Sequence, residues 1–209
     1  MSDPMRDAPR RLTDEQRATL LGVAAEAVRD AFATMRLDLP DDGRFEPALR
    51  EPGATFVTLE RGEQLLGCIG TLEPVRPLAL DVAHNALAAA FGDPRLPPLR
   101  PDDYPAMSIK VSVLSRPEPL AVAGYEDVKR VVRPHVDGLL LEAGTARSTL
   151  LPSVWPKIRD VDEFLEVLWR KAGLRPGEWR PGTRVSCYAT DEFADLGPRP
   201  ALSVIARRA

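Results

Sequence analysis

The chain has 209 residues, of which 44% are apolar and 28% are charged, and its 28 basic and 31 acidic residues give a net charge of −3. This length allows one large domain or two small ones, and the apolar fraction is sufficient for a hydrophobic core. The near balance of charge argues against a nucleic acid as the main partner. No apolar run reaches the roughly 20 residues of a membrane-spanning helix, and the chain start lacks the apolar stretch of a secretion signal. We therefore expect a cytoplasmic protein that does not bind a membrane.

The first part of the chain predicts a tail, a helix and a hairpin. Residues 1–12 are polar and contain proline, so we expect them to form a flexible tail. Thr13 and Gln16 have the spacing of a capping box, and apolar residues then recur at helical spacing, which predicts a helix of about six turns. Residues 54–60 and 64–71 are rich in β-forming side chains and flank a short turn, as in a hairpin.

The remaining elements follow from the same rules. Pro77 can occupy the first turn of a helix that ends before Gly92 and Pro94. Apolar and polar residues alternate over 107–113, as in a strand with one buried face. Later elements are a hairpin at 138–142 and 147–151, a helix capped by Asp160 and ended by Gly173, and a strand at 183–190. Hairpin strands with helices between them predict an α+β fold of antiparallel sheets with packed helices, and not a doubly wound parallel sheet.

The most distinctive stretch is residues 65–71, Leu-Leu-Gly-Cys-Ile-Gly-Thr, in which two glycines flank Cys68 inside an apolar strand. Glycine weakens a strand and so needs a reason. One interpretation is that Gly67 and Gly70 let a ligand or another backbone approach closely and present the thiol in a cleft. The other is close packing around a buried cysteine, which the residues alone favour because most buried cysteines are inert. Cys187 is interpreted as an ordinary strand residue, and the two cysteines do not predict a disulfide framework.

Two further pairs of polar residues are candidates for a site. Arg95 lies in a proline-rich loop where it could bind an acidic ligand, although Asp93 is close enough in the sequence to pair with it instead. His135 and Asp137 alternate along a predicted extended segment, so they could form an acid–base pair or simply orient a surface loop.

His84 has Asp81 three residues before it on one helical face, close enough for a hydrogen bond, and we expect a solvated or capping role. Metal binding has little support, because the chain has two histidines, two cysteines and no CxxC or HExxH spacing. Residues 67–70 also lack the spacing of a phosphate-binding loop and the helix that follows one. We therefore expect neither a metal nor a cofactor.

Residues 65–70 belong to a longer series of motifs in a fixed order. The series comprises 55–59, 65–70, 77–78, 88–91, 93–95, 97–99, 111–115, 133–139, 150–155, 164–165, 171–174 and Trp179. It resembles the AMMECR domain family, whose signature is usually Leu-Arg-Gly-Cys-Ile-Gly, and in particular the bacterial form called AmmeMemoRadiSam system protein A. The resemblance implies one domain at 13–193, with a larger subdomain on an antiparallel sheet and a smaller subdomain packed against it, and a C-terminal extension at 194–209.

The resemblance also implies a site. Cys68 is the catalytic candidate, near a cleft, and the candidate binding residues are Gly67, Gly70, Thr71, Arg95, Lys110, His135 and Asp137. Leu66 stands where the family usually has arginine, which removes a guanidinium from the site and leaves Arg95 or Lys110 as the cation for an anionic ligand. Leu96 replaces a usual phenylalanine, and we expect this change to affect packing only.

The family name places such proteins in a three-part system with a Memo-like protein and a radical-SAM protein, which suggests joint action in one modification pathway. In this hypothesis Cys68 is a nucleophile, a radical relay or the carrier of a covalent adduct, acting on a small-molecule or protein substrate. The alternative hypothesis is a non-catalytic module that binds a ligand or a partner and in which Cys68 only packs. The sequence identifies no substrate and leaves open whether the protein is an enzyme.

Overall fold

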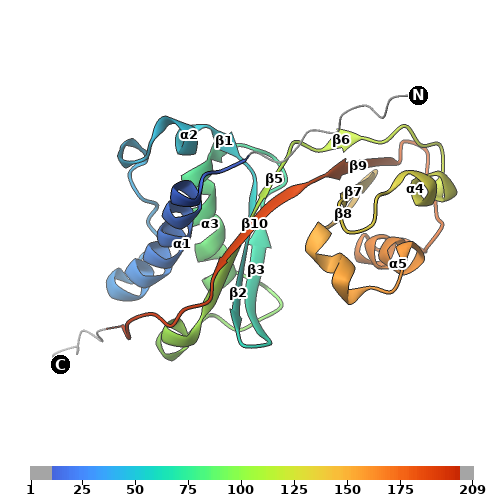
Figure 1. Cartoon of the computed structure of the whole chain (residues 1–209). Helices are drawn as coiled ribbons and strands as arrows, with labels where there is room; N and C mark the ends of the chain where they lie inside the picture. The colour runs from blue at the N-terminus through green and yellow to red at the C-terminus, as the bar shows by residue number, and fades with distance from the viewer. Residues whose placement is uncertain (1–10, 203–209) are drawn as a thin grey trace. The chain divides into compact units, whose positions relative to one another are not determined.

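The computed structural model describes residues 11–202, which form two compact units. The larger unit comprises residues 11–113 together with 191–202, and the smaller unit comprises residues 114–190. The smaller unit is therefore inserted between two segments of the larger one, as the colour sequence along the chain in Figure 1 shows. Within residues 11–202, no helix is both long enough and apolar enough to cross a membrane.

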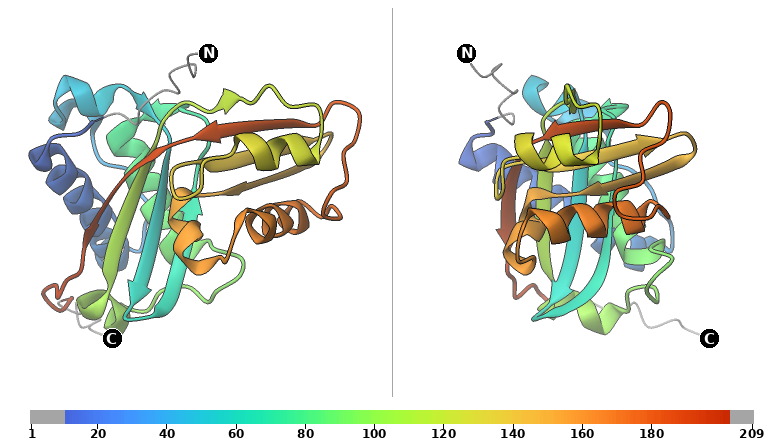
Figure 2. Two further views of the ribbon diagram at one scale, coloured as in Figure 1. Left: turned by 45° about the vertical axis from the view of Figure 1, so that its right-hand side comes forward. Right: turned by 90° about the vertical axis from the view of Figure 1, so that its right-hand side faces the viewer.

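The larger unit is built on a four-stranded sheet with the order β10-β5-β2-β3. The strands are β2 (Thr55–Arg61), β3 (Gln64–Gly70), β5 (Ser108–Leu114) and β10 (Thr190–Asp195). Helix α3 (Leu78–Phe91) packs on β2 and β3, and α1 (Asp14–Thr34) packs on α3, so both helices cover the same face of the sheet (Figure 2). Val57, Leu59, Ile109 and Val111 are fully buried on that face. Shorter elements complete the unit: η1 (Asp42–Arg44), α2 (Pro47–Arg50), the paired strands β1 (Pro52–Gly53) and β4 (Arg76–Pro77), and η2 (Pro101–Ala106).

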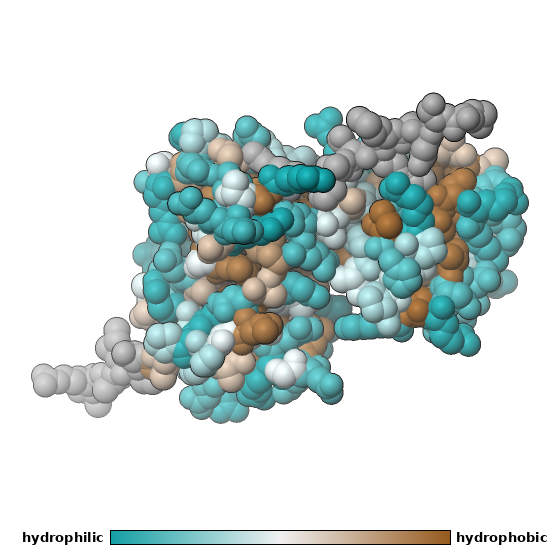
Figure 3. Space-filling model, viewed as in Figure 1, coloured by the Kyte–Doolittle hydropathy of each residue, from teal (hydrophilic) through white to brown (hydrophobic). Residues whose placement is uncertain are grey.

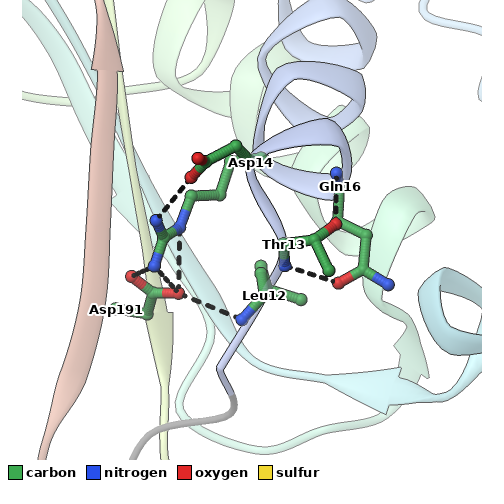
Figure 4. Close-up of polar contacts among 6 residues, drawn as sticks. Leu12, Thr13, Asp14, Gln16 and Asp191 are labelled. Atoms are coloured by element: carbon green, nitrogen blue, oxygen red, sulfur yellow. Dashed lines mark hydrogen bonds and ion pairs between the residues drawn. The ribbon is translucent and has the colours of Figure 1, made fainter.

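The predicted capping box at the start of α1 is present. The Thr13 hydroxyl accepts a hydrogen bond from the Gln16 backbone N–H at 3.2 Å, and the Gln16 side chain accepts one from the Thr13 backbone at 2.9 Å (Figure 4). The backbone N–H of Leu12 donates to Asp191 of β10 at 3.4 Å, and the Leu12 side chain, 6% exposed, packs in the core. The chain is therefore anchored at Leu12, inside the segment expected to be a tail, and residues 1–10 of that tail lie outside the described residues.

The predicted C-terminal extension also contributes to the larger unit. The backbone N–H of Arg199 donates to the Pro105 carbonyl at 2.9 Å, and Leu202 packs against the core. Residues 203–209 lie outside the described residues.

The smaller unit contains a second four-stranded sheet with the order β6-β9-β7-β8, in which neighbouring strands are antiparallel. Its elements are β6 (Glu118–Pro119), α4 (Tyr125–Val131), β7 (Gly138–Ala143), β8 (Ala146–Leu150), η3 (Pro152–Lys157), α5 (Val161–Lys171) and β9 (Arg184–Tyr188). The Asp160 side chain caps α5 by accepting from the Glu163 backbone at 2.9 Å, as its position predicted. The core of this unit is centred on Trp155 and Phe164, whose rings stack with centroids 3.8 Å apart.

The predicted α+β class is confirmed, since both main sheets have antiparallel pairings and helices packed on them. One predicted strand is wrong in its extent. Residues 183–190 form β9 only as far as Tyr188, and β10 begins at Thr190, where the chain passes from the smaller to the larger unit. The acidic β10 segment carries little β propensity, and its pairing in the sheet was not predicted. The face visible in Figure 3 is mainly hydrophilic, with apolar residues in separate patches, as the balanced composition led us to expect.

Candidate functional site around Cys68

Cys68 lies on β3, the strand at the edge of the larger sheet, directly opposite Thr58 of β2. In an antiparallel pair of strands, hydrogen-bonded and non-hydrogen-bonded residue pairs alternate. The backbone N–H of Thr71 donates to the Thr55 carbonyl at 2.9 Å, so Thr55 and Thr71 form a hydrogen-bonded pair. Three residues further along β2, Thr58 and Cys68 therefore form a non-hydrogen-bonded pair. Side chains in such a pair lie close together, and the Thr58 hydroxyl accordingly hydrogen-bonds the Cys68 sulfur at 3.2 Å. The backbone N–H and C=O of Cys68 point away from β2, toward the edge.

Asp93 and Arg95, which follow α3, hydrogen-bond the backbone groups of Cys68 at this edge. The Cys68 N–H donates to Asp93 Oδ2 at 3.0 Å, and Arg95 Nη2 donates to the Cys68 carbonyl at 2.9 Å. Arg95 also holds Asp93 through Nε and Nη2, at 2.9 and 2.7 Å. The Arg95 guanidinium holds the pKa of the Asp93 carboxyl far below its ordinary value of 3.8. Arg95 thus pairs with Asp93, the second of its two predicted roles, and together they fix the backbone of Cys68.

Gly67 and Gly70 are required by packing inside the unit. A Cβ on Gly67 would lie 1.9 Å from the backbone oxygen of Ala89 in α3, and a Cβ on Gly70 would lie 2.2 Å from the ring of Phe56. Gly67 therefore does permit the close approach of another backbone, but that backbone is α3. Packing accounts for both glycines without a ligand.

Leu66 points into the core, not toward the thiol. Leu59 of β2 pairs with Gly67 of β3, but the next residue, Glu60, pairs with Leu65. Leu66 has no partner in β2 and is the extra residue of a β-bulge. Its side chain is 9% exposed and belongs to the core cluster. Thr58, and Cys68 opposite it, face the other side of the sheet. The leucine itself is therefore directed away from the thiol, and the prediction that it removes a guanidinium from the site stays a prediction.

The face of the sheet opposite α3 carries mostly polar side chains, and we call it the polar face. It consists of Phe56, Thr58, Glu60, Cys68, Ser108, Lys110 and Ser112. Thr58 pairs with Cys68 on one side and with Lys110 of β5 on the other, so these three form one row across the sheet. Cys68, Thr58 and Lys110 are all half-buried. Ser112 donates to Glu192 of β10 at 2.9 Å.

Thr71 belongs to a buried polar cluster that the sequence did not reveal. Asp81 in α3 is fully buried and accepts hydrogen bonds from Thr55 (backbone 3.0 Å, hydroxyl 2.8 Å), the Thr71 hydroxyl (2.6 Å), Asn85 (2.9 Å) and Arg76 (2.8 Å). This carboxylate joins the first residue of β2 to the residue that follows β3. Asp81 and Asn85, polar residues four apart on an otherwise apolar helical face, were the available signal.

The sequence spacing would also allow Asp81 to hydrogen-bond His84, but both oxygens of Asp81 are directed to the cluster. Burial, and secondly the charge of Arg76, lowers the pKa of His84 below its ordinary value of 6.5. His84 is half-buried on α3.

His135 and Asp137 lie in the smaller unit, in a turn and not in the extended segment that was expected. His135 has a left-handed backbone with φ of 64°, and its ring centroid is 6.0 Å from that of Trp155. Asp137 is 1% exposed and accepts from Arg133 through the backbone N–H (2.8 Å), Nε (3.1 Å) and Nη2 (2.8 Å). These contacts give Asp137 the role of bracing the turn. The acid–base pair stays a prediction.

Among residues 11–202, no group of three or more His, Cys, Asp or Glu side chains has the arrangement of a metal site. Cys68 and Cys187 do not form a disulfide, and they differ in environment, since Cys187 is 2% exposed in the core of the smaller unit while Cys68 is half-buried on the polar face. A cavity of about 270 Å³ is lined by α1 and the segment after it, including Glu26, Asp30 and Leu39. A cleft beside Cys68 stays a prediction.

The fold and the site define an α+β protein in which a glycine-flanked cysteine lies on the edge strand of an antiparallel sheet. The sequence profile of the AMMECR1 family matches residues 21–193, so the chain belongs to the AMMECR1 family. A protein from Methanothermobacter thermautotrophicus is 39% identical over 200 residues, which cover 92% of this chain and 100% of that one. A protein from Thermofilum pendens is 37% identical over 205 residues, with 90% and 94% covered. The crystal structure of an uncharacterized protein from Pyrococcus horikoshii superimposes with a TM-score of 0.82 at 32% identity, covering 90% of this chain and 95% of that chain.

Proposed function

We propose that the polar face around Cys68 is the working surface of this protein, and that the protein acts with a Memo-like protein and a radical-SAM protein in a modification pathway. The partnership is supported by the resemblance of the motif series to AmmeMemoRadiSam system protein A and by membership of the AMMECR1 family. We also propose that the family domain spans residues 13–193 and that the protein is cytoplasmic.

The observation that carries the proposal is that hydrogen bonds hold the half-buried residue Cys68 in a defined position. All three polar groups of Cys68 have side-chain partners: Asp93 at the N–H, Arg95 at the carbonyl and Thr58 at the sulfur. Three such contacts on one residue hold the sulfur in a defined position, which a reactive group requires. Cys187 has a different environment, since it is enclosed by apolar side chains in a core. A positioned thiol outside the core is suited to be a nucleophile or the carrier of an adduct.

A second candidate function is a non-catalytic binding module in which Cys68 only packs. It is favoured by the absence of a base at the sulfur, because among the described residues the hydrogen-bond partner of Sγ is the Thr58 hydroxyl and not a histidine or a carboxylate. A thiol used as a nucleophile commonly has such a base nearby. The packing explanation of Gly67 and Gly70 is also compatible with this second function.

Alkylation of the native protein with iodoacetamide separates the two functions, with mass spectrometry assigning the adducts. Cys187, at 2% exposure, is the internal comparison. The proposal predicts that Cys68 is labelled at least about tenfold faster than Cys187 in the folded state, since access and position control thiol reactivity. Thr58→Val removes the hydroxyl but keeps the branched shape, so it should alter the rate at Cys68 and not at Cys187. Equal slow labelling of both thiols until unfolding would establish the binding module.

The proposed partnership has its own test. The protein and a radical-SAM protein from the same organism should form a complex at micromolar concentration in size-exclusion chromatography, and Cys68→Ser should weaken or abolish the modification that the mixture produces. Cys187→Ser is the matched control and should leave it unchanged. No complex at micromolar concentration, in the presence and absence of the Memo-like protein, would refute the partnership.

A further inference from the structure

We infer that the polar face binds the oxyanion of a small ligand, a carboxylate or a phosphate, and that Lys110 is its counter-cation in the row that also holds Thr58 and Cys68. This inference rests on the proposed function, because it names the chemical class of ligand that the polar face would receive.

The first support is register. Lys110 and Cys68 lie on the strands either side of Thr58, each directly opposite it. Neighbouring strands are about 4.8 Å apart, so the Cα atoms of Lys110 and Cys68 are about 10 Å apart on the same face. The flexible stem of a lysine covers much of that distance. An oxyanion held over Thr58 would therefore contact the ammonium of Lys110 and leave the rest of the ligand beside the sulfur.

The second support is that the Lys110 side chain has no counter-ion among the described residues. Lys110 is half-buried, and its ammonium forms neither an ion pair nor a hydrogen bond with any residue that the structure describes. The other lysines are accommodated: Lys129 pairs with Glu126 at 3.1 Å and Asp162 at 2.5 Å, Lys171 donates to the Thr149 carbonyl at 2.9 Å, and Lys157 is exposed to solvent. A lysine ammonium that is not neutralised by a carboxylate of the protein attracts an incoming anion at this position.

The other candidate cation, Arg95, is already neutralised. Its Nε and Nη2 bond to the buried carboxylate of Asp93, and Nη2 also holds the Cys68 carbonyl. Position 66 carries leucine and points into the core. Lys110 is therefore the cation of the polar face that is available to a ligand.

Two carboxylates limit the size of that ligand. Glu60 lies two residues from Thr58 on the same face, and Glu192 accepts from Ser112, two residues from Lys110. Neither carboxylate forms an ion pair with Lys110 among the described residues. A polyanion that spread over the polar face would meet both negative charges, whereas a single oxyanion at Lys110 avoids them. The ligand class is thus a small molecule with one anionic group.

Amide NMR tests the site directly, with inorganic phosphate and acetate titrated separately as probes. We expect saturable shifts at Thr58, Cys68 and Lys110, and the probe that binds more tightly identifies the preferred oxyanion. Lys110→Met should weaken binding at least about tenfold, Lys110→Arg should preserve it within about threefold, and the exposed control Lys157→Met should not change it. Absence of saturable shifts on the polar face for both probes, or equal binding in Lys110→Met, would overturn the inference.

The thiol gives a second readout, because iodoacetate is anionic and iodoacetamide is its neutral counterpart. If Lys110 attracts anions beside Cys68, Lys110→Met should lower the iodoacetate rate at Cys68 about fivefold and leave the iodoacetamide rate unchanged, as expected for one charge acting over about 10 Å near a protein surface. An iodoacetate rate that does not respond to Lys110→Met overturns the inference and leaves the proposed function standing. A thiol inert to both reagents refutes the reactive thiol, and the amide titration still decides the oxyanion site.

Discussion

Replacing Asp93 with asparagine tests whether the Asp93–Arg95 pair holds the edge of β3. The carboxylate is 2% exposed and accepts four hydrogen bonds, two at each oxygen: Oδ1 from the Arg95 backbone at 3.1 Å and Nε at 2.9 Å, and Oδ2 from Arg95 Nη2 at 2.7 Å and the Cys68 backbone at 3.0 Å. Asparagine keeps one oxygen and places an NH₂ group where the other was. The two N–H groups that bonded the lost oxygen then face an NH₂ group, which cannot accept from them. Asp93→Asn therefore removes two of the four hydrogen bonds and the negative charge.

The expected loss of unfolding free energy follows from these contacts. A hydrogen bond to a charged group contributes about 1.5–3 kcal/mol, and removing one partner of a buried ion pair costs about 3–5 kcal/mol. The Arg95 side chain is 58% exposed and regains water when its partner is lost, which reduces the cost. We therefore expect Asp93→Asn to destabilise the larger unit by about 2–3 kcal/mol at pH 7.

The dependence on pH has a defined sign. The pKa of Asp93 is depressed in the folded protein, so its contribution is fully present above the unfolded value of 3.8 and is lost as the pH falls toward the folded value. Urea unfolding followed by circular dichroism should show a constant difference between wild type and Asp93→Asn from about pH 8 to pH 5, closing below about pH 4. All three tryptophans lie in residues 114–190, so their fluorescence reports the smaller unit for comparison.

Asp30→Asn is the matched control, because Asp30 is 61% exposed and pairs with Arg29 at 2.9 Å on the surface of α1. Its replacement should change stability by no more than about 0.5–1 kcal/mol. A loss at Asp93 no larger than that at Asp30, or a difference that already closes near pH 6, would refute the role assigned to the pair.

Two further predictions concern α3 and the strand it covers. Gly67→Ala should destabilise the protein by about 3 kcal/mol in thermal or urea unfolding, because its Cβ would lie 1.9 Å from the Ala89 backbone oxygen. The control Gly22→Ala, whose Cβ would have nothing within 4 Å, should stabilise α1 by up to about 1 kcal/mol. Equal effects of the two substitutions would contradict the packing explanation. His84 should titrate below pH 6.5 in histidine NMR, and Arg76→Gln should raise its midpoint; a wild-type midpoint at or above 6.5 would contradict the assigned burial.

Local sequence patterns predicted much of the fold because their causes lie within a few residues. The capping box of Thr13 and Gln16, the cap at Asp160 and the hairpin formed by β2 and β3 all depend on neighbours close in the chain. The alternation over residues 107–113 likewise gave a strand with one buried face, and Ile109 and Val111 are indeed fully buried. The motif series led correctly to the family.

The contacts of the candidate site were decided by tertiary structure. Asp93 is 25 residues from Cys68, and Asp81 is 26 from Thr55, so their hydrogen bonds depend on how α3 lies on the sheet. The sequence placed Leu66 beside the thiol because the two residues are neighbours in a strand. The β-bulge turned Leu66 into the core, since one extra residue reverses which face a side chain occupies.

The sequence by itself therefore determined the family and the α+β class, and it singled out the stretch around Cys68 as the candidate site. Tertiary structure decided what surrounds that cysteine: α3 explains Gly67, Asp93 and Arg95 secure the backbone, and the register of β2 and β5 places Lys110 in the row of Cys68. The physical reason is the distance along the chain between the residues that interact. Caps, turns and alternation act between near neighbours, whereas register, close packing and buried polar contacts join segments that only the folded chain brings together.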